Sequence, residues 1–212
     1  MILLIPLGGI GERFRSAGYN EPKALINVER KPIIFWLLDN ISHLHIDYIY
    51  IIYNKEYELY DFEKIITERY TSTVFKFLKL EKNTDGALET VSIALNEIKD
   101  EIDKPIICVD GDNFYTADII SLWNGENSII TFNDVNTHFI PKFSYIQTNC
   151  DNNVINIKEK EYFEDDKVAT ACTGAYGFSS FKELLKYARI VIDMKYKVKN
   201  EYYISSVIQY MI

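Results

Sequence analysis

The sequence has 212 residues, 48% hydrophobic and 25% charged, which excludes a disordered or collagen-like chain. Its 31 acidic and 23 basic side chains give a net charge of −8, whereas a nucleic-acid binder needs a basic face. No apolar run approaches the ~20 residues that span a bilayer. MILLIPLGG lacks the basic flank of a signal peptide, and the three cysteines form no C-x-x-C pair. We expect a single cytoplasmic domain over residues 1–212, without nucleic-acid or membrane partners; a homo-oligomer is left open.

The first half of the chain alternates between two hydrophobic patterns. Continuous apolar, β-branched and aromatic runs are typical of strands that are buried on both faces. Stretches with helical spacing lie between these runs, and Pro32 suits the first turn of one such helix. Strands are predicted over Ile2–Leu7, Asp47–Tyr53, Val74–Leu80 and Ile106–Val109, and helices over Pro32–Leu44, Glu56–Tyr70 and Gly86–Ile98. This alternation predicts βαβ units and a parallel sheet.

The second half of the chain changes character. Short strand-like runs are separated there by turns rich in Asn and Asp. Strands are predicted over Ser128–Phe132, Phe143–Thr148, Val154–Lys158 and Thr170–Phe178, and helices over about Ser179–Asp193 and Asn200–Ile212. We therefore expect an α/β fold in which a mainly parallel sheet is extended by a mixed part.

Three polar turns follow predicted strands, at Gly8–Arg13, Lys82–Ala87 and Asp110–Asn113. In open α/β sheets, ligands bind outside the carboxyl ends of the strands, near the point where the strand order switches. The three turns are therefore expected to meet at one edge of the sheet and to carry the chemistry.

The first of these turns is rich in glycine and is followed by two cations. Glycine permits positive φ and lets backbone N–H groups approach an anion closely. The turn matches neither the P-loop nor the dinucleotide fingerprint, so by itself it is equally well explained as a tight structural turn. Arg13 directly after the turn, and Lys23 after Pro22, favour a phosphate clamp over a solvated surface pair.

The Asp110-Gly111-Asp112-Asn113 turn places two carboxylates just past a buried strand. Mg²⁺ prefers a few carboxylate oxygens and completes its shell with waters and substrate phosphates. An Asx turn or a helix cap is the alternative interpretation of this turn, and the D-G-D pattern alone does not decide between them.

Together these motifs resemble the sugar-phosphate nucleotidyltransferase superfamily, the NDP-sugar pyrophosphorylase-like enzymes, and most closely its small members from capsule and surface-glycan pathways. Seven segments follow the family's order over nearly the whole chain, and the first two are specific as a pair. They are P-L-G-G-I-G-E-R-F (6–14), E-P-K-A-L-I-N-V-E-R-K-P-I-I (21–34), T-D-G-A-L-E-T-V (84–91), V-D-G-D-N-F-Y (109–115), I-K-E-K (157–160), T-G-A-Y-G-F (173–178) and N-E-Y-Y-I-S-S-V-I (200–208). The resemblance implies a glycosyltransferase-A-like (Rossmann-like) three-layer sandwich.

The resemblance also implies roles for individual residues. Arg13 and Lys23 match the catalytic cations at the reacting phosphates, and Asp112 matches the family's magnesium-binding aspartate, with Mn²⁺ as a substitute for Mg²⁺. The implied nucleotide-binding positions are Leu7, Gly8, Gly9, Gly11, Asp85, Gly86, Ala87 and Asp110. The implied acceptor-binding positions are Glu159, Lys160 and Gly174.

Two departures from the family pattern stand out. Glu29-Arg30-Lys31 replaces the usual G-K before Pro32, which indicates a turn variant. The chain stops at Ile212, where relatives usually continue into a strand and turn that supply a second metal ligand. The resemblance thus leaves open a chain shortened at its C-terminus or metal binding by Asp112 together with substrate oxygens.

The function that we expect is transfer of a nucleoside monophosphate from a nucleoside triphosphate to a small phosphorylated acceptor, with release of pyrophosphate. The relatives favour CTP ahead of UTP or dTTP, and the acceptor is either a sugar phosphate or a non-sugar phosphate. Two alternatives remain: a non-catalytic nucleotide-binding module, and a D-x-D glycosyltransferase.

Lys158 lies two residues before Lys160, so on a strand both could face one acceptor phosphate, or Lys158 could face solvent.

Overall fold

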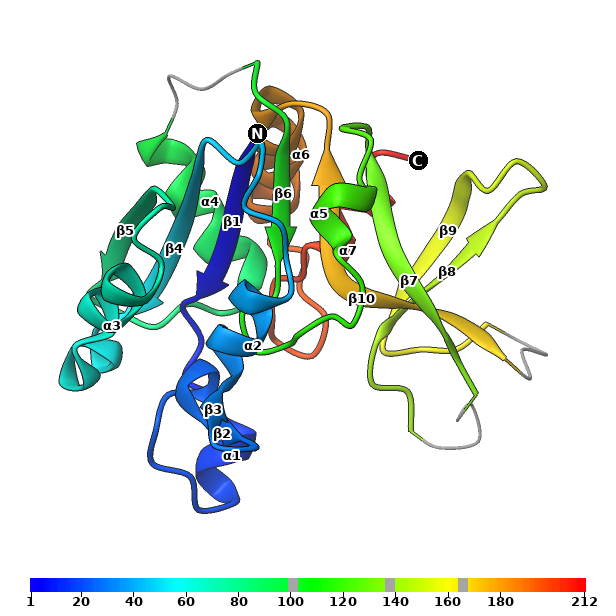
Figure 1. Ribbon diagram of the computed structural model, residues 1–212. Coiled ribbons are helices and arrows are strands. Elements are labelled where there is room, and N and C mark those ends of the chain that lie inside the picture. The colour runs from blue at the N-terminus through cyan, green and yellow to red at the C-terminus, as the bar shows by residue number, and fades with distance from the viewer. Residues whose placement is uncertain (99–102, 136–139, 164–167) are drawn as a thin grey trace.

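The computed structural model describes residues 1–98, 103–135, 140–163 and 168–212. Its centre is an eight-stranded sheet in the order β5-β4-β1-β6-β10-β8-β9, with β7 also paired to β10 (Figure 1). The strands are β1 (Ile2–Leu7), β4 (Tyr48–Asn54), β5 (Phe75–Leu80), β6 (Ile106–Val109), β7 (Ser128–Asp134), β8 (Ser144–Thr148), β9 (Val154–Glu159) and β10 (Ala169–Phe178). A separate two-stranded hairpin consists of β2 (Asn27–Val28) and β3 (Lys31–Pro32).

The four strands from the first half are parallel, as the alternating pattern predicts. From β1 the chain moves to β4 and β5 on one side, and then returns to β6 on the other side of β1. The strand order therefore switches between β1 and β6, and the carboxyl ends of all four strands lie along one edge of the sheet (Figure 1). The strands β6 and β10 are antiparallel, so the sheet is mixed from that point on.

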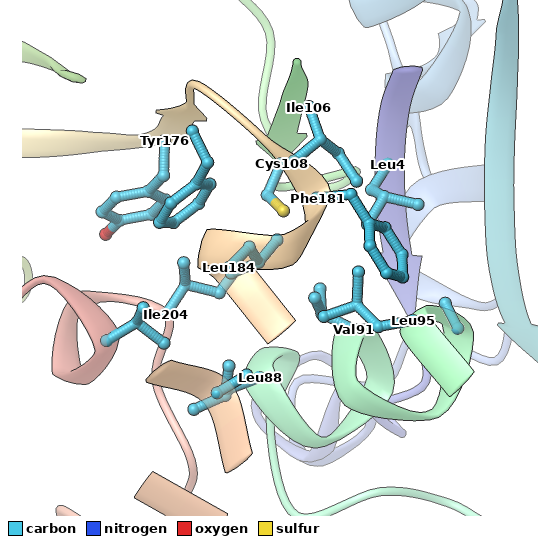
Figure 2. Close-up of a cluster of buried hydrophobic side chains, with 14 of the residues drawn as sticks. Leu4, Leu88, Val91, Leu95, Ile106, Cys108, Tyr176, Phe181, Leu184 and Ile204 are labelled. Atoms are coloured by element: carbon cyan, nitrogen blue, oxygen red, sulfur yellow. The ribbon is translucent and has the colours of Figure 1, made fainter. Parts of the chain in front are cut away.

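Helices cover both faces of the sheet, because the central strands are apolar on both faces. One face packs against α4 (Ala87–Glu97), α6 (Phe181–Asp193) and α7 (Ser205–Gln209). In Figure 2, Leu88, Val91 and Leu95 of α4 lie in the same buried cluster as Phe181 and Leu184 of α6. The other face packs against α2 (Ile33–Asp39), α3 (Phe62–Arg69) and α5 (Ile119–Leu122).

The short elements of the first half were not predicted from the sequence. They are α1 (Glu12–Ser16) and two 3₁₀ helices, η1 (Lys23–Leu25) and η2 (Lys55–Tyr60). The predicted helix over Glu56–Tyr70 is in fact η2 followed by α3, because Asp61 has a φ of 50° and interrupts the helical backbone. The helix predicted over Pro32–Leu44 ends earlier, with α2 stopping at Asp39.

The C-terminal segment departs most from prediction. A helix was expected over Asn200–Ile212, but α7 covers only Ser205–Gln209. Residues 200–204 are instead non-helical, with a bridge between Glu201 and Val198, and the N–H of Tyr202 donates to the carbonyl oxygen of Asp85 at 2.7 Å. This tertiary hydrogen bond competes with the local helical pattern. Within the described ranges, none of the helices combines the length and apolar character needed to cross a bilayer.

Candidate active site

The glycine turn follows β1 at the edge where the strand order switches. Gly8 packs closely, because a Cβ there would lie 2.3 Å from the Thr90 hydroxyl oxygen. Gly11 has a φ of 66° and precedes α1. Leu7, the last residue of β1, is buried beneath the turn. The turn thus needs glycine at Gly8 for space and at Gly11 for backbone conformation.

The peptide groups of this turn are held from the outside by β4 and α1. The buried amide of Asn54 donates to the carbonyl oxygen of Gly9 at 3.0 Å. Arg15 Nε donates to the carbonyl oxygen of Ile10 at 3.1 Å, and its guanidinium pairs with Glu56. In a trans peptide the N–H points opposite to the carbonyl, so the N–H groups of Ile10 and Gly11 face away from this clamp. Neither N–H has an acceptor among the described residues, as an anion-binding loop requires.

Lys23 reaches the switch point from η1. Its ammonium pairs with the carboxylate of Asp112 and lies 5.4 Å from the ring centroid of Phe14. Burial and the nearby Arg13 guanidinium lower the pKa of Lys23. The carboxylates of Asp110 and Glu201 oppose that shift. The two predicted catalytic cations therefore lie close enough to act on one anionic ligand.

The two carboxylates after β6 have different surroundings. The N–H of Asp110 donates to the carbonyl oxygen of Gly174 at 2.9 Å, and a Cβ at Gly174 would lie 2.3 Å from an Asp110 carboxylate oxygen. Burial raises the pKa of Asp110 to about 6, although the Lys23 ammonium acts in the opposite direction. Asp112 is half-buried and pairs with Lys23. Gly174 of β10 therefore makes room for Asp110, and its predicted role in acceptor binding stays a prediction.

The turn between β5 and α4 is fixed by the C-terminal segment. Gly86 has a φ of 129°, and a Cβ there would lie 2.4 Å from the carbonyl oxygen of Tyr202. That carbonyl accepts from the N–H of Leu88 at 3.1 Å. The exposed Asp85 carboxylate pairs with Lys197 Nζ at 2.6 Å, and Ala87 begins α4. The backbone of the turn is thus rigid, while the Asp85 side chain is engaged by Lys197.

The predicted acceptor residues lie at the end of β9. Glu159 accepts hydrogen bonds from the hydroxyls of Ser144 and Ser205, the latter at 2.6 Å. Burial raises its pKa, and these hydroxyls oppose the shift. Lys160 has a φ of 54°, contacts the Tyr203 hydroxyl and lowers the pKa of Lys23. The cations of the two halves of the chain therefore lie close enough to influence one another.

Lys158 and Lys160 have separate partners. Lys158 Nζ pairs with Glu161 at 2.6 Å, whereas Lys160 Nζ lies 4.3 Å from the ring centroid of Tyr203. Their alternation on β9 ends at Glu159, where the strand stops and the backbone turns. The two lysines therefore have different neighbours, and which of them binds an acceptor phosphate stays a prediction.

Sequence reasoning missed three residues of this site. They are Asn54, Glu201 and Tyr203. Asn54 supports the glycine turn, and the Tyr203 hydroxyl, which Lys160 contacts, donates to the Glu201 carboxylate at 2.6 Å. The N-E-Y-Y segment was noted as a family match, but no role was given to its side chains. Asn54 could have been found from the sequence, because it is a polar residue directly after an apolar run that predicts a strand.

The donor set fits a metal that is held mainly by its substrate. Among the residues that the structure describes, three or more histidine, cysteine, aspartate or glutamate side chains nowhere gather into a metal-binding group. Asp112 nevertheless holds a cation, the Lys23 ammonium, and Asp110 is two residues away. One or two carboxylates match the share that Mg²⁺ takes from a protein when waters and phosphates complete its shell.

The chain is similar to known proteins in both sequence and fold. It is 29% identical over 160 residues to the bifunctional protein GlmU of Methanococcus vannielii, and 26% identical over 178 residues to that of Methanocaldococcus jannaschii. These matches cover 76% and 84% of this chain, which spans only 35% and 40% of those curated relatives.

Two solved structures illustrate the likeness of fold. The nucleoside-diphosphate-sugar pyrophosphorylase of Vibrio cholerae RC9 has a TM-score of 0.79 at 20% identity, covering 100% of this chain and 87% of that one. The CTP:phosphocholine cytidylyltransferase of Streptococcus pneumoniae has a TM-score of 0.70 at 17% identity, covering 98% and 84%. The family model described as nucleotidyl transferase matches residues 2–212. With that match along almost its whole length, the chain belongs to the nucleotidyl transferase family.

Proposed function

We propose that the protein transfers a nucleoside monophosphate from a nucleoside triphosphate to a small phosphorylated acceptor and releases pyrophosphate. The observation that carries this proposal is the grouping of Arg13 and Asp112 around Lys23 beside the glycine turn, with Lys160 near enough to act on the same ammonium. The triphosphate would lie against the free N–H groups of the turn, and the acceptor phosphate would lie near Lys160.

In this reaction an acceptor phosphate oxygen attacks the α-phosphorus, and the bond from that phosphorus to the oxygen that bridges the α- and β-phosphates breaks, so that pyrophosphate leaves with that oxygen. An ionised phosphate is already a nucleophile, so no protein nucleophile or general base is needed. Arg13 and Lys23 would hold the phosphates in line and offset the negative charge that develops on them. Mg²⁺, or Mn²⁺ in its place, would be held by Asp112 and would add positive charge at the triphosphate.

We further propose CTP as the favoured nucleotide, ahead of UTP and dTTP, and a role in making capsule or surface glycans. The fold likeness to a CTP:phosphocholine cytidylyltransferase supports CTP and a non-sugar acceptor. The likeness to a nucleoside-diphosphate-sugar pyrophosphorylase supports a sugar phosphate instead. Both acceptors carry the phosphate that Lys160 would bind, so the two remain to be separated by assay.

The decisive experiment measures pyrophosphate release from CTP, UTP, dTTP, ATP and GTP with Mg²⁺, using phosphocholine or glucose 1-phosphate as acceptor. Lys23→Ala and Asp112→Asn should each lower turnover by about 10²–10³, typical of losing one electrostatic contact to a transition state. Lys31→Ala, at an ion pair with Asp39 outside the site, is the control.

Three results would contradict the proposal. Pyrophosphate release that survives both site substitutions would exclude the assigned residues. Nucleotide binding without release for either acceptor would favour a binding module. Reaction with a nucleotide-sugar but with none of the triphosphates would favour the D-x-D glycosyltransferase.

A further inference from the structure

The carboxylate that would hold the metal is paired with a cation of the protein itself. Lys23 Nζ pairs directly with Asp112, and the two side chains are 27% and 25% exposed. A contact that is this sheltered from solvent is only weakly screened. The Arg13 guanidinium is also close enough to lower the pKa of Lys23. A divalent ion that approached Asp112 alone would therefore meet two positive groups.

Lys23 and Asp112 come from different parts of the chain. Asp112 lies in the turn after β6, whereas Lys23 belongs to η1, a short element outside the large sheet. A lysine ammonium is a compact charge on a flexible four-carbon stem, so it can move to a new anion while its backbone stays in place. Triphosphate on the glycine turn would offer Lys23 such an anion and would leave the Asp112 carboxylate unpaired.

We propose that Lys23 and a divalent metal exclude each other at Asp112, so that the metal binds only together with the triphosphate that draws Lys23 away. The idea rests on the proposed function for the identity of the triphosphate. It adds that Lys23 governs when the metal enters, besides acting on the phosphates. Nucleotide and metal binding are then positively coupled, and metal alone binds weakly.

The test titrates nucleotide-free protein with Mn²⁺ and follows the free ion by electron paramagnetic resonance. Wild-type protein should bind Mn²⁺ only weakly, and Lys23→Met should bind it about tenfold more tightly or better, the effect of removing one like charge at a sheltered site. Lys23→Arg keeps the charge and should match wild type. Asp112→Asn, added to Lys23→Met, should remove the gain.

The matched control is Lys31→Met. Lys31 pairs with Asp39 at 2.9 Å, and both side chains are 25% exposed, so the pair has nearly the same exposure as Lys23 and Asp112. This variant should leave Mn²⁺ binding at the wild-type level. Asp39 keeps its ion pair with Arg69 at 2.7 Å in this variant, so the control removes a lysine charge without freeing a carboxylate. Tightening in both methionine variants would mean that lowering the positive charge of the protein is enough to tighten the ion, which would overturn the specific role of Lys23.

Two further outcomes would overturn the proposal. One is tight Mn²⁺ binding by nucleotide-free wild-type protein, a measurement that needs no variant to fold. The other is a folded Lys23→Met protein, as judged by circular dichroism, that binds Mn²⁺ no better than wild type. The Mn²⁺ titration contains neither acceptor nor triphosphate, so its result does not depend on whether the protein releases pyrophosphate. If the enzyme is active but Lys23 does not exclude Mn²⁺ from Asp112, only this inference is refuted and the proposed function stands.

Discussion

Asn54 joins the end of β4 to the glycine turn through its side chain. Its amide nitrogen donates to Gly9, and its amide oxygen accepts from the N–H of Glu56 at 3.1 Å. Asn54→Asp keeps the acceptor but sets a carboxylate oxygen against the Gly9 carbonyl. We expect about tenfold weaker triphosphate binding, since the turn loses the bond that orients its N–H groups.

Steady-state kinetics would separate this positioning effect from a general loss of structure. KM for the triphosphate should rise, while KM for the acceptor stays unchanged. Asn127→Asp is the control, because its amide likewise bridges a backbone N–H, that of Ser179, and a second group, Glu183, on the α6 side of the molecule. Equal changes in both KM values would contradict a role confined to the turn.

Asp110 makes the stability of the protein depend on pH. Its folded-state pKa is raised from 3.8 to about 6, so its contribution to stability is fully present below pH 4 and is lost as pH rises through 6. A shift of two units corresponds to about 2–3 kcal/mol. In EDTA, Asp110→Asn should therefore gain unfolding free energy over wild type between about pH 4 and 7.

Urea denaturation at a series of pH values measures this difference. Asp39 is the counterpart of opposite sign, because hydrogen bonds from Arg69 and Tyr70 outweigh its burial and hold its pKa at about 2. The stability that Asp39 contributes is present above pH 4 and is lost as pH falls through the folded-state pKa. The deficit in unfolding free energy of Asp39→Asn relative to wild type should therefore be largest near neutral pH. A pH-independent difference for Asp110→Asn would show that its carboxyl titrates normally.

At the scale of elements, the turn before α4 and the C-terminal segment depend on each other through Gly86. A Cβ there would meet both the carbonyl oxygen and the nitrogen of Tyr202, at 2.4 and 2.7 Å, and the φ of 129° is unfavourable for alanine. Gly86→Ala should destabilise the protein by roughly 3 kcal/mol or more, since rigid backbone cannot yield cheaply.

Gly125→Ala separates the two causes of that loss. Gly125 has a φ of 84° but open space around its Cβ position, so its substitution adds backbone strain without a clash. We expect a cost of about 1 kcal/mol for this control. Urea denaturation compares the two variants, and similar losses would mean that the contact with Tyr202 has little weight.

Helices and strands could be predicted from the sequence where the hydrophobic pattern of the segment itself decides its structure, and not where contacts with distant residues decide it. Ile2–Leu7 and Ile106–Val109 are strands as predicted, because a continuous apolar run has few alternatives to a buried strand. The stretch 200–204 has the composition of a helix but bonds to Asp85 and Val198 instead. Such competition from tertiary hydrogen bonds leaves no mark in the periodicity.

At the scale of the whole molecule, the first three predicted turns meet because parallel strands end at one edge, so topology alone brings Gly8–Arg13 close to Asp110 and Asp112. The residues predicted to bind the acceptor are brought together in a different way. Lys160 and Tyr203 arrive from the antiparallel part of the sheet and from the C-terminal segment. Sequence motifs indicated that these segments matter, but only the fold shows that Tyr203 holds Lys160.

Under the proposed function, that arrangement would divide the binding of the two substrates between the two halves of the chain. Lys160 lies beyond β9, opposite the glycine turn, and its ammonium rests on Tyr203 rather than on a carboxylate. Lys160→Ala should therefore raise KM for the phosphorylated acceptor about tenfold or more, because a charge-assisted contact to phosphate is lost. Binding of the triphosphate should change little.

Lys158→Ala is the matched control, since Lys158 lies two residues away and already pairs with Glu161. It should leave both substrates nearly unaffected. Calorimetry with triphosphate and kinetics with acceptor together test the assignment. Lost triphosphate binding with normal acceptor kinetics in Lys160→Ala would reverse the roles of the two halves. Equal effects of the two alanine substitutions would show that the lysines act through general charge and that Lys160 makes no specific contact with the acceptor.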